Sequence, residues 1–356
     1  MSEQQLNSPS ITFVIGAGAS KEVNMPMGVE LKASIARALA FKVDFNTLTG
    51  GDSVIREALS QLARSREGRG GLNDYVRASL LISSAMPQAP SIDNFIDSHR
   101  SNPLVAECGK LAIAAEILRA ERRSLLYVDP ASTRNKLKFD QLPETWFGRF
   151  WELLTQNANL EGLPERLSKV RIVTFNYDRT VEHYLYWSLQ NYYDVKPNEA
   201  AELLARLIIL HPYGTVGCLP WQQARLDLQV PFGGELGSGG LLKVASGIRT
   251  FTEGTDTESS HIELIRSSIW DATRLVFLGF AFHELNLQVL YGQGRDTPRR
   301  YDHEVYGSAL GVSESNKNAI VGELRDIGRY DRDQIALRRE LTAAQVLLEY
   351  SRRLRI

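Results

Sequence analysis

Three short segments of the sequence place glycine or polar side chains directly after an apolar run typical of a buried strand. Gly16-Ala17-Gly18-Ala19-Ser20 follows one such run, Asn176 and Asp178 follow a second, and His211 follows a third. Open α/β sheets bind ligands at the carboxyl ends of their strands. An amide both donates and accepts hydrogen bonds, a carboxylate accepts them, and an imidazole exchanges a proton near neutral pH. These segments are therefore the candidates for ligand binding and proton transfer.

The first segment has the layout of a phosphate-binding turn. Two glycines remove the Cβ atoms where a pyrophosphate would approach the backbone, and the next helix offers free N–H groups. The dinucleotide fingerprint Gly-x-Gly-x-x-Gly is incomplete, because Lys21 stands in place of the third glycine. The alternative is a turn whose glycines serve only tight packing between strand and helix.

The polar residues of the other two segments each have two interpretations. Asn176 suits holding a water or a ribose hydroxyl, and Asp178 suits accepting from a carboxamide or orienting a neighbour, but both could merely cap a helix over Arg179–Gln190. His211 suits a general base or a group that polarises a ribose hydroxyl, but a lone histidine can also be an ordinary surface or core residue. The remaining histidines show no metal-ligand spacing: His99, His183, His261, His283 and His303.

Composition narrows the class of protein. The chain has 356 residues, a net charge of -1 and 43% hydrophobic residues, which is typical of a globular protein without a general affinity for nucleic acid or anionic lipid. Its two cysteines, Cys108 and Cys218, predict neither a zinc module nor a disulfide framework. The N-terminal residues lack the pattern of a signal peptide and no run is long enough to span a membrane, so we expect a cytoplasmic protein.

Strand and helix signals predict an α/β fold, a Rossmann-like doubly wound parallel sheet with an inserted helical subdomain. We expect the core in residues 1–40 and 166–356 and the insertion in residues 41–165. Strands are predicted at Ile11–Ile15, Arg171–Phe175, Leu207–Leu210, Leu275–Leu278 and Glu304–Ala309, and helices at Gly28–Ala40, Val54–Ala63, Leu72–Ser83, Leu104–Leu126, Thr145–Leu154 and Arg338–Arg353. The glycine-rich stretch Thr215–Ser260 is predicted to be a long loop near the ligand cleft.

Together and in this order, the three segments resemble the motifs of the sirtuin superfamily. The sirtuin motif Gly-Ala-Gly-Ile-Ser lines the NAD⁺ pyrophosphate and is similar to Gly16–Ser20. The motif Thr-Gln-Asn-Ile-Asp contacts the nicotinamide-side ribose and the carboxamide, and it matches Thr174, Asn176 and Asp178, with Phe175 and Tyr177 in the variable places. The catalytic histidine matches His211, although Pro212 and Tyr213 separate it from Gly214.

Two further segments carry weaker likeness to the same family. Met25-Pro26-Met27-Gly28 resembles the flexible cofactor-binding loop, and Arg274–Phe280 resembles the late strand and glycine turn on the adenosine side. The resemblance spans roughly residues 11 to 30 and 170 to 310. It implies Asn176 and His211 as catalytic residues, and as NAD⁺-binding residues Gly16, Ala17, Gly18, Ser20, Pro26, Phe175, Asp178 and Gly279.

Two departures from the deacylases favour another activity. Sirtuin deacylases carry two Cys-x-x-Cys pairs on zinc, which Cys108 and Cys218 cannot supply, and they lack a helical insertion between the first two motifs. In both traits, and in the sequence Phe175-Asn176-Tyr177-Asp178, the chain resembles the sirtuin-like proteins of bacterial antiphage defence that hydrolyse NAD⁺. The resemblance implies a metal-free NAD⁺ glycohydrolase that acts in abortive infection. It also implies a homo-oligomer controlled by a HerA-like ATPase, with an Argonaute-type partner less favoured because the chain has no appended guide-binding module.

Two other functions are compatible with the same residues. The same fold could form a zinc-free deacylase or ADP-ribosyltransferase, or a non-catalytic module that senses NAD⁺ or ADP-ribose and signals by assembly. Free ADP-ribose as the product would indicate hydrolysis, and tight binding without turnover would indicate sensing.

Overall fold

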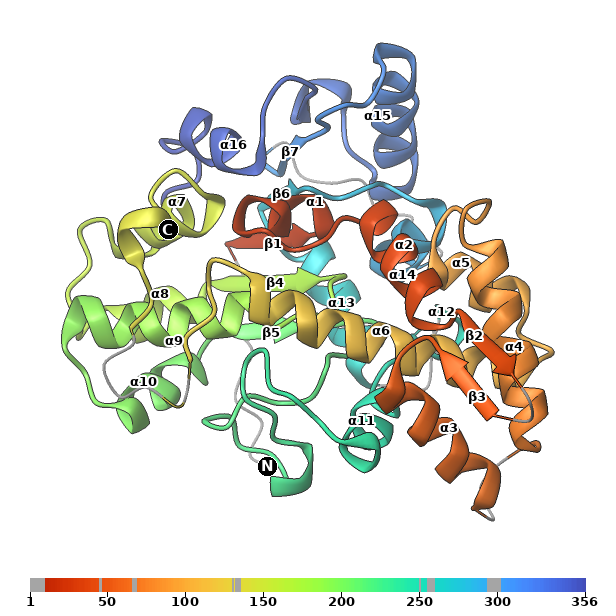
Figure 1. Cartoon of the computed structure of the whole chain (residues 1–356). Coiled ribbons are helices and arrows are strands. Elements are labelled where there is room, and N and C mark those ends of the chain that lie inside the picture. Colours follow the sequence, from red (N-terminus) through yellow and green to blue (C-terminus); the bar gives the residue numbers. More distant parts are fainter. Residues whose placement is uncertain are drawn as a thin grey trace.

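A parallel β-sheet forms the centre of the molecule (Figure 1). The computed structural model describes residues 10–44, 47–65, 69–129, 131, 136–249, 251–254, 260–292 and 302–356, so the polar N-terminus before Ser10 lies outside the described residues. Six strands hydrogen-bond in the order β5-β4-β1-β6-β7-β8, and every pair is parallel. Their bounds are β1 Ile11–Ile15, β4 Val170–Thr174, β5 Ile208–Leu210, β6 Arg274–Leu278, β7 Glu304–Ser308 and β8 Ile335–Arg338.

The order of the strands is that of a Rossmann-like sheet. The chain starts at the central strand β1, adds β4 and β5 on one side, and then adds β6, β7 and β8 on the other. The direction of winding therefore reverses between β1 and β6, which is where such sheets open a ligand crevice. The predicted α/β class with a doubly wound parallel sheet is confirmed.

Both faces of the sheet are buried, and alternation along each strand divides the core in two. On β1, Phe13 and Ile15 contact one hydrophobic cluster and Val14 contacts the other. On β6, Leu278 contacts the first cluster and Phe277 the second. Such near-continuous apolar strands are typical of parallel sheets covered on both sides.

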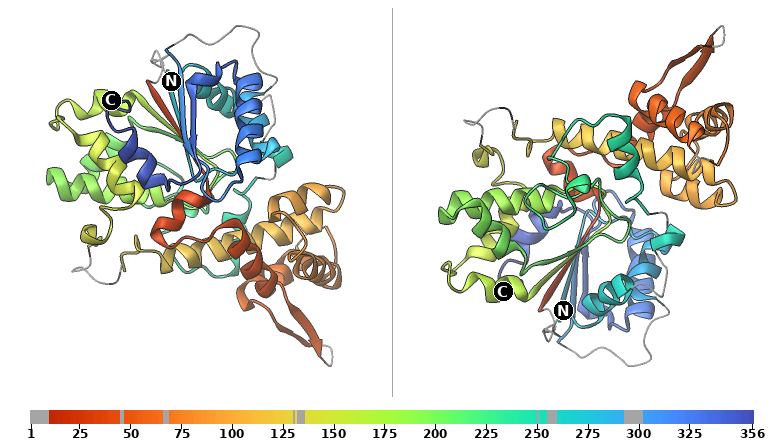
Figure 2. Two further views of the ribbon diagram at one scale, coloured as in Figure 1. Left: turned by 90° about the horizontal axis from the view of Figure 1, so that it is seen from above. Right: turned by 90° about the horizontal axis from the view of Figure 1, so that it is seen from below.

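Helices cover the two faces (Figure 2). One layer comprises α7 Trp146–Thr155, α8 Leu163–Ser168, α9 Thr180–Tyr193, α10 Pro197–Leu204 and α16 Ala343–Glu349. The other comprises α13 Ser260–Trp270, α14 Glu284–Tyr291 and α15 Glu314–Gly328. The helices α1 Ala17–Ser20 and α2 Gly28–Ala38 follow β1, and short 3-10 turns lie at Lys21–Val23, Phe139–Gln141, Leu226–Leu228 and Arg332–Gln334.

The predicted insertion is largely helical and extends from one end of the sheet (Figure 2). It contains α3 Ser53–Arg64, α4 Leu72–Ala85, α5 Ile92–Ser98 and α6 Pro103–Arg123, and also a hairpin of β2 Phe41–Asp44 and β3 Thr47–Gly50 that the sequence patterns did not indicate. Strands of four residues are too short to show a clear period. Helix α7 lies within the predicted insertion but packs on α16 and α9, so it belongs to the helical layer of the core.

Two other predictions need correction. The stretch Thr215–Ser260 is not simply a loop, because it forms α11 Ser238–Ala245 and α12 Phe251–Gly254; residues 250 and 255–259 lie outside the described part. Arg338 ends β8, and the C-terminal helix begins only after Thr342, whose hydroxyl accepts from Gln345 N as an N-cap. The prediction of a helix from Arg338 followed the leucine spacing and missed this cap.

Candidate active site

The glycine turn after β1 packs against the turn after β6. Gly16 N donates to Leu278 O at 3.0 Å, and Gly18 N donates to Gly279 O at 3.0 Å. A Cβ on Gly16 would lie 2.6 Å from Gly279 O, and a Cβ on Gly279, whose φ is +57°, would lie 1.9 Å from Ala19 N. Close backbone contact between the two turns therefore requires glycine at these positions, whatever ligand they bind. Gly18 is exposed and Ala17 is half-buried at the surface of this turn.

Ser20 and Asn176 bring the first two segments into contact. Ser20 lies at the end of α1 and Asn176 lies two residues beyond β4, the neighbour of β1. Asn176 Nδ2 donates to Ser20 Oγ at 2.8 Å, and Asn176 N donates to Thr174 Oγ1 at 3.3 Å. The Asn176 side chain is buried and its Nδ2 is occupied by Ser20, while an amide Oδ1 can accept a hydrogen bond from a hydroxyl or water.

His211, from the end of β5, contacts Asn176 and forms with Ser20 and Asn176 the cluster of the candidate site. Its Nδ1 lies 3.0 Å from Asn176 O, and its Nε2 lies 2.8 Å from Glu182 Oε1 on α9. Burial lowers the pKa of His211, but the Glu182 carboxylate and its hydrogen bond, the Asn176 carbonyl and the charge of Asp178 outweigh that effect, so the net pKa is raised. The three sequence segments thus meet through Ser20, Asn176 and His211.

Asp178 hydrogen-bonds the first residue of the helix that follows. Its Oδ1 accepts from Thr180 N at 3.1 Å and from Thr180 Oγ1 at 2.5 Å. Burial is the main reason that the pKa of Asp178 rises to about 6, against the lowering effect of the Thr180 bonds. Asp178 therefore binds the first residue of α9 from the position before the N-cap, which is Arg179.

The remaining predicted residues lie around this cluster. Phe175 is buried and packs its ring against Tyr213 and Phe280, with centroid distances of 5.5 and 5.1 Å. Pro26 is half-buried in the connection between the turn at Lys21–Val23 and α2, and it makes no hydrogen bond with the cluster. Phe175 thus belongs to the apolar wall of the site, whereas Pro26 directly follows Met25, whose N donates to Ser20 O at 3.1 Å.

A buried ion pair fixes the residue that follows Asp178. Arg179 and Glu121 are 1% and 0% exposed, and the guanidinium meets the carboxylate through Nε at 3.0 Å and Nη2 at 2.5 Å. Glu121 also accepts from Arg179 N at 3.0 Å and from Gly233 N at 2.9 Å. This network attaches α6 and the 230–233 segment to the end of β4.

Glu182, Glu121 and the bond from Tyr177 to Asp93 of α5 were not predicted from the sequence. One feature of the sequence indicated Glu182 weakly. This residue lies in the first turn of the helix after the second segment, where a side chain can face the strand ends. No such feature indicated Glu121 and Asp93, since both lie in the insertion, far away in sequence. The insertion therefore contributes directly to holding the segment from Tyr177 to Arg179.

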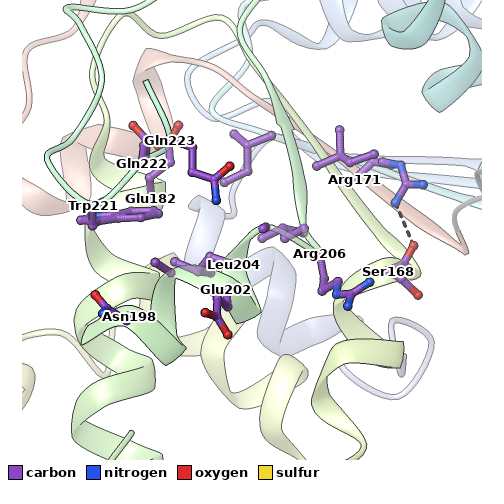
Figure 3. Close-up of a pocket in the computed structure, with 15 residues that line it drawn as sticks. Ser168, Arg171, Glu182, Asn198, Glu202, Leu204, Arg206, Trp221, Gln222 and Gln223 are labelled. Carbon is purple, nitrogen blue, oxygen red and sulfur yellow. Dashed lines mark hydrogen bonds between the residues drawn. The ribbon is translucent and has the colours of Figure 1, made fainter. Parts of the chain in front are cut away.

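A groove with a volume of about 900 Å³ runs along the edge strand β5 (Figure 3). Its lining includes Arg171, Arg206, Trp221 and Glu182, but neither Asn176 nor His211. Glu182 links the groove and the cluster, because it lines the groove and contacts His211. We place the candidate active site at the cluster, because there, within the part of the chain that the structure describes, groups suited to proton transfer converge at the carboxyl ends of the strands.

Comparisons with known proteins add no family. No protein-family model matches the chain, and no curated protein sequence matches it significantly.

Within the described residues, no helix is long and apolar enough to cross a membrane, and no group of three or more His, Cys, Asp or Glu side chains could hold a metal ion. Both cysteines are free thiols, Cys108 buried and Cys218 half-buried.

Proposed function

We propose that the protein is a sirtuin-like NAD⁺ glycohydrolase that cleaves NAD⁺ to nicotinamide and ADP-ribose. The observation that carries the proposal is the contact of Ser20, Asn176 and His211, which come from three distant segments and meet beside the glycine turn. The Rossmann-like strand order supports a dinucleotide as the ligand, since such sheets bind dinucleotides at this edge.

Cleavage of the bond between nicotinamide and ribose needs positioning more than acid catalysis. The transition state resembles an oxocarbenium ion, and the leaving group is already cationic in NAD⁺. In the proposed mechanism Asn176 Oδ1 orients the attacking water or the ribose 2′-hydroxyl, and His211 accepts the proton that this oxygen loses. Asp178 holds the carboxamide, and Gly16, Ala17, Gly18 and Gly279 form the backbone surface for the pyrophosphate.

The biological setting follows from the same resemblance. We propose a cytoplasmic effector of bacterial antiphage defence that depletes NAD⁺ when infection is sensed. A homo-oligomer under the control of a HerA-like ATPase is the arrangement we favour over an Argonaute-type partner.

The experiment is NAD⁺ consumption by the purified wild-type chain, alone and with a HerA-like ATPase. Asn176→Ala removes the group that orients the nucleophile, so turnover should fall by about 10²-fold or more. Asn191→Ala is the matched control, because Asn191 is exposed on α9 and should leave turnover unchanged. Equal activity in the two variants would refute the assignment of Asn176.

One observation favours a second candidate, a module that binds NAD⁺ or ADP-ribose without cleaving it. Both ring nitrogens of His211 already contact protein acceptors, so neither offers a lone pair to a substrate in this arrangement. Calorimetric binding of NAD⁺ without release of nicotinamide, with the ATPase present, would establish the sensing module.

A further inference from the structure

The hydrogen bonds of His211 determine how many protons its ring carries. Asn176 O is a backbone carbonyl and only accepts, so Nδ1 at 3.0 Å must carry a hydrogen. Nε2 lies 2.8 Å from a carboxylate oxygen of Glu182, and a lone pair on Nε2 would face a second acceptor. A proton therefore lies between Nε2 and Glu182. The pair holds one proton more than a neutral imidazole and a free carboxylate.

Both members of the pair are shielded from solvent, which strengthens their interaction. The side chains of His211 and Glu182 are 10% and 7% exposed. A charge-assisted hydrogen bond between buried groups is shorter and stronger than one in water. The ring is thus fixed at both ends, by α9 on one side and by the end of β4 on the other.

We propose that Glu182 is a positioning residue of the candidate site, which holds the His211 ring in its doubly protonated form until the pair releases one proton. This inference rests on the proposed function and names the residue that controls it. In the holding state His211 donates to Asn176 O and fixes the backbone of that residue. His211 gains the lone pair that a base requires only after the proton leaves.

The groove along β5 supplies the route for that proton. Glu182 lines the groove, and its Oε2 is buried without a hydrogen-bond partner among the described residues. The Nε2–H bond of His211 breaks as an O–H bond forms on Glu182, and that O–H bond then breaks in transfer to water in the groove. The pair ends as a neutral imidazole and a carboxylate, and their facing lone pairs favour movement of the ring toward a ribose hydroxyl.

Other titratable groups face the pair from neighbouring segments. Asp178 contributes a negative charge that favours the protonated ring. His261 on α13 is close enough for the His211 charge to contribute to lowering its pKa, after burial and Arg249. Cys218 lies near Glu182, whose charge contributes, after burial, to raising the thiol pKa. Glu182 is the one that bonds to the ring, so its removal should dominate any change.

The test is the titration of His211 in the full-length apo protein by NMR of the histidine ring signals, with His211→Gln identifying the signal. In the wild type His211 should titrate above the ordinary histidine pKa of about 6.5. Glu182→Gln keeps an acceptor for Nε2 but removes the charge, and it should lower the midpoint by at least about one pH unit. Glu202→Gln is the control, because Glu202 lines the same groove without contacting the ring and should leave the midpoint unchanged.

NAD⁺ cleavage as a function of pH separates this inference from the proposed function. The activity of Glu182→Gln should reach its plateau at lower pH than that of the wild type. A midpoint that moves in a protein that cleaves no NAD⁺ supports the positioning role and overturns only the proposed hydrolase. Cleavage that depends on Asn176, with the same His211 midpoint in wild type and Glu182→Gln, overturns the positioning role and leaves the hydrolase. If Glu182→Gln does not fold, a wild-type midpoint at or below about 6.5 overturns it alone.

Discussion

Replacing Glu121 by glutamine tests the network that attaches the insertion to the site. Glu121 is fully buried and accepts four hydrogen bonds, from Arg179 N, Nε and Nη2 and from Gly233 N. Glutamine has nearly the same shape, so the substitution removes the charge and one acceptor oxygen without opening a cavity. The Arg179 guanidinium then stays buried, with carbonyls of Val230 and Pro231 as its other partners.

The size of the effect follows from the desolvated cation. Removing one partner of a buried ion pair costs about 3–5 kcal/mol, because the other charge is left uncompensated. Two carbonyl acceptors reduce that cost, while the lost acceptor for Gly233 N adds about 1–3 kcal/mol. We therefore expect Glu121→Gln to lower the free energy of unfolding by about 4 kcal/mol. That is a large part of the ~5–15 kcal/mol that stabilises a typical domain.

Urea unfolding followed by circular dichroism measures this free energy. The control is Glu235→Gln, since Glu235 pairs with Arg122 at the surface, with side chains 83% and 41% exposed. Exposed pairs contribute less than about 1 kcal/mol, so the control should unfold close to the wild type. A cost below about 1 kcal/mol for Glu121→Gln would refute the argument that this buried pair anchors the site.

Two further predictions concern the segments around the cluster. Gly279→Ala should lower the free energy of unfolding in urea by at least about 3 kcal/mol, because a Cβ at a φ of +57° would overlap Ala19 N. The control Gly311→Ala, with a φ of +79° and open space around it, should lower it by about 1–2 kcal/mol, and equal losses would contradict the close contact of the two turns. Burial raises the pKa of Asp178 to about 6 in the folded protein, against an ordinary 3.8. The contribution of Asp178 to the free energy of unfolding is therefore fully present below pH ~4, where the group is protonated, and is lost as the pH rises through about 6. Asp178→Asn should therefore stabilise the protein by ~3 kcal/mol near pH 7.5 and by little near pH 4, as measured by unfolding at both pH values, and a gain that does not depend on pH would contradict a buried charge.

The sequence predicted those parts of the fold that depend on local pattern. β1, β4, β6 and β7 are short apolar runs that end in glycine or polar residues, and each lies within one residue of the predicted bounds. The longer helices of the insertion have a clear 3.6-residue period, and α3, α4 and α6 formed where that period occurs. The edge strand β8 was missed, because its four residues, Ile335–Arg338, precede a stretch with helical leucine spacing.

The candidate site was predictable only in part, for a physical reason. Ser20, Asn176 and His211 each follow a strand of a parallel sheet, so the fold class alone brings them to the same edge. Glu182, which contacts His211, and Glu121, which contacts Arg179, lie on helices whose rotation and packing decide which side chains face inward. No short-range pattern records that geometry, and only the folded chain reveals the partners.

The ratio of the products formed from NAD⁺ distinguishes hydrolysis from transfer and from sensing, and it is measured for the wild-type chain with and without a HerA-like ATPase. Chromatography quantifies nicotinamide and ADP-ribose in the same sample. We expect the two products to appear in equal amounts and both to disappear in Asn176→Ala. Nicotinamide without free ADP-ribose would indicate transfer to an acceptor instead of water, and NAD⁺ that stays intact while bound would contradict the hydrolase altogether.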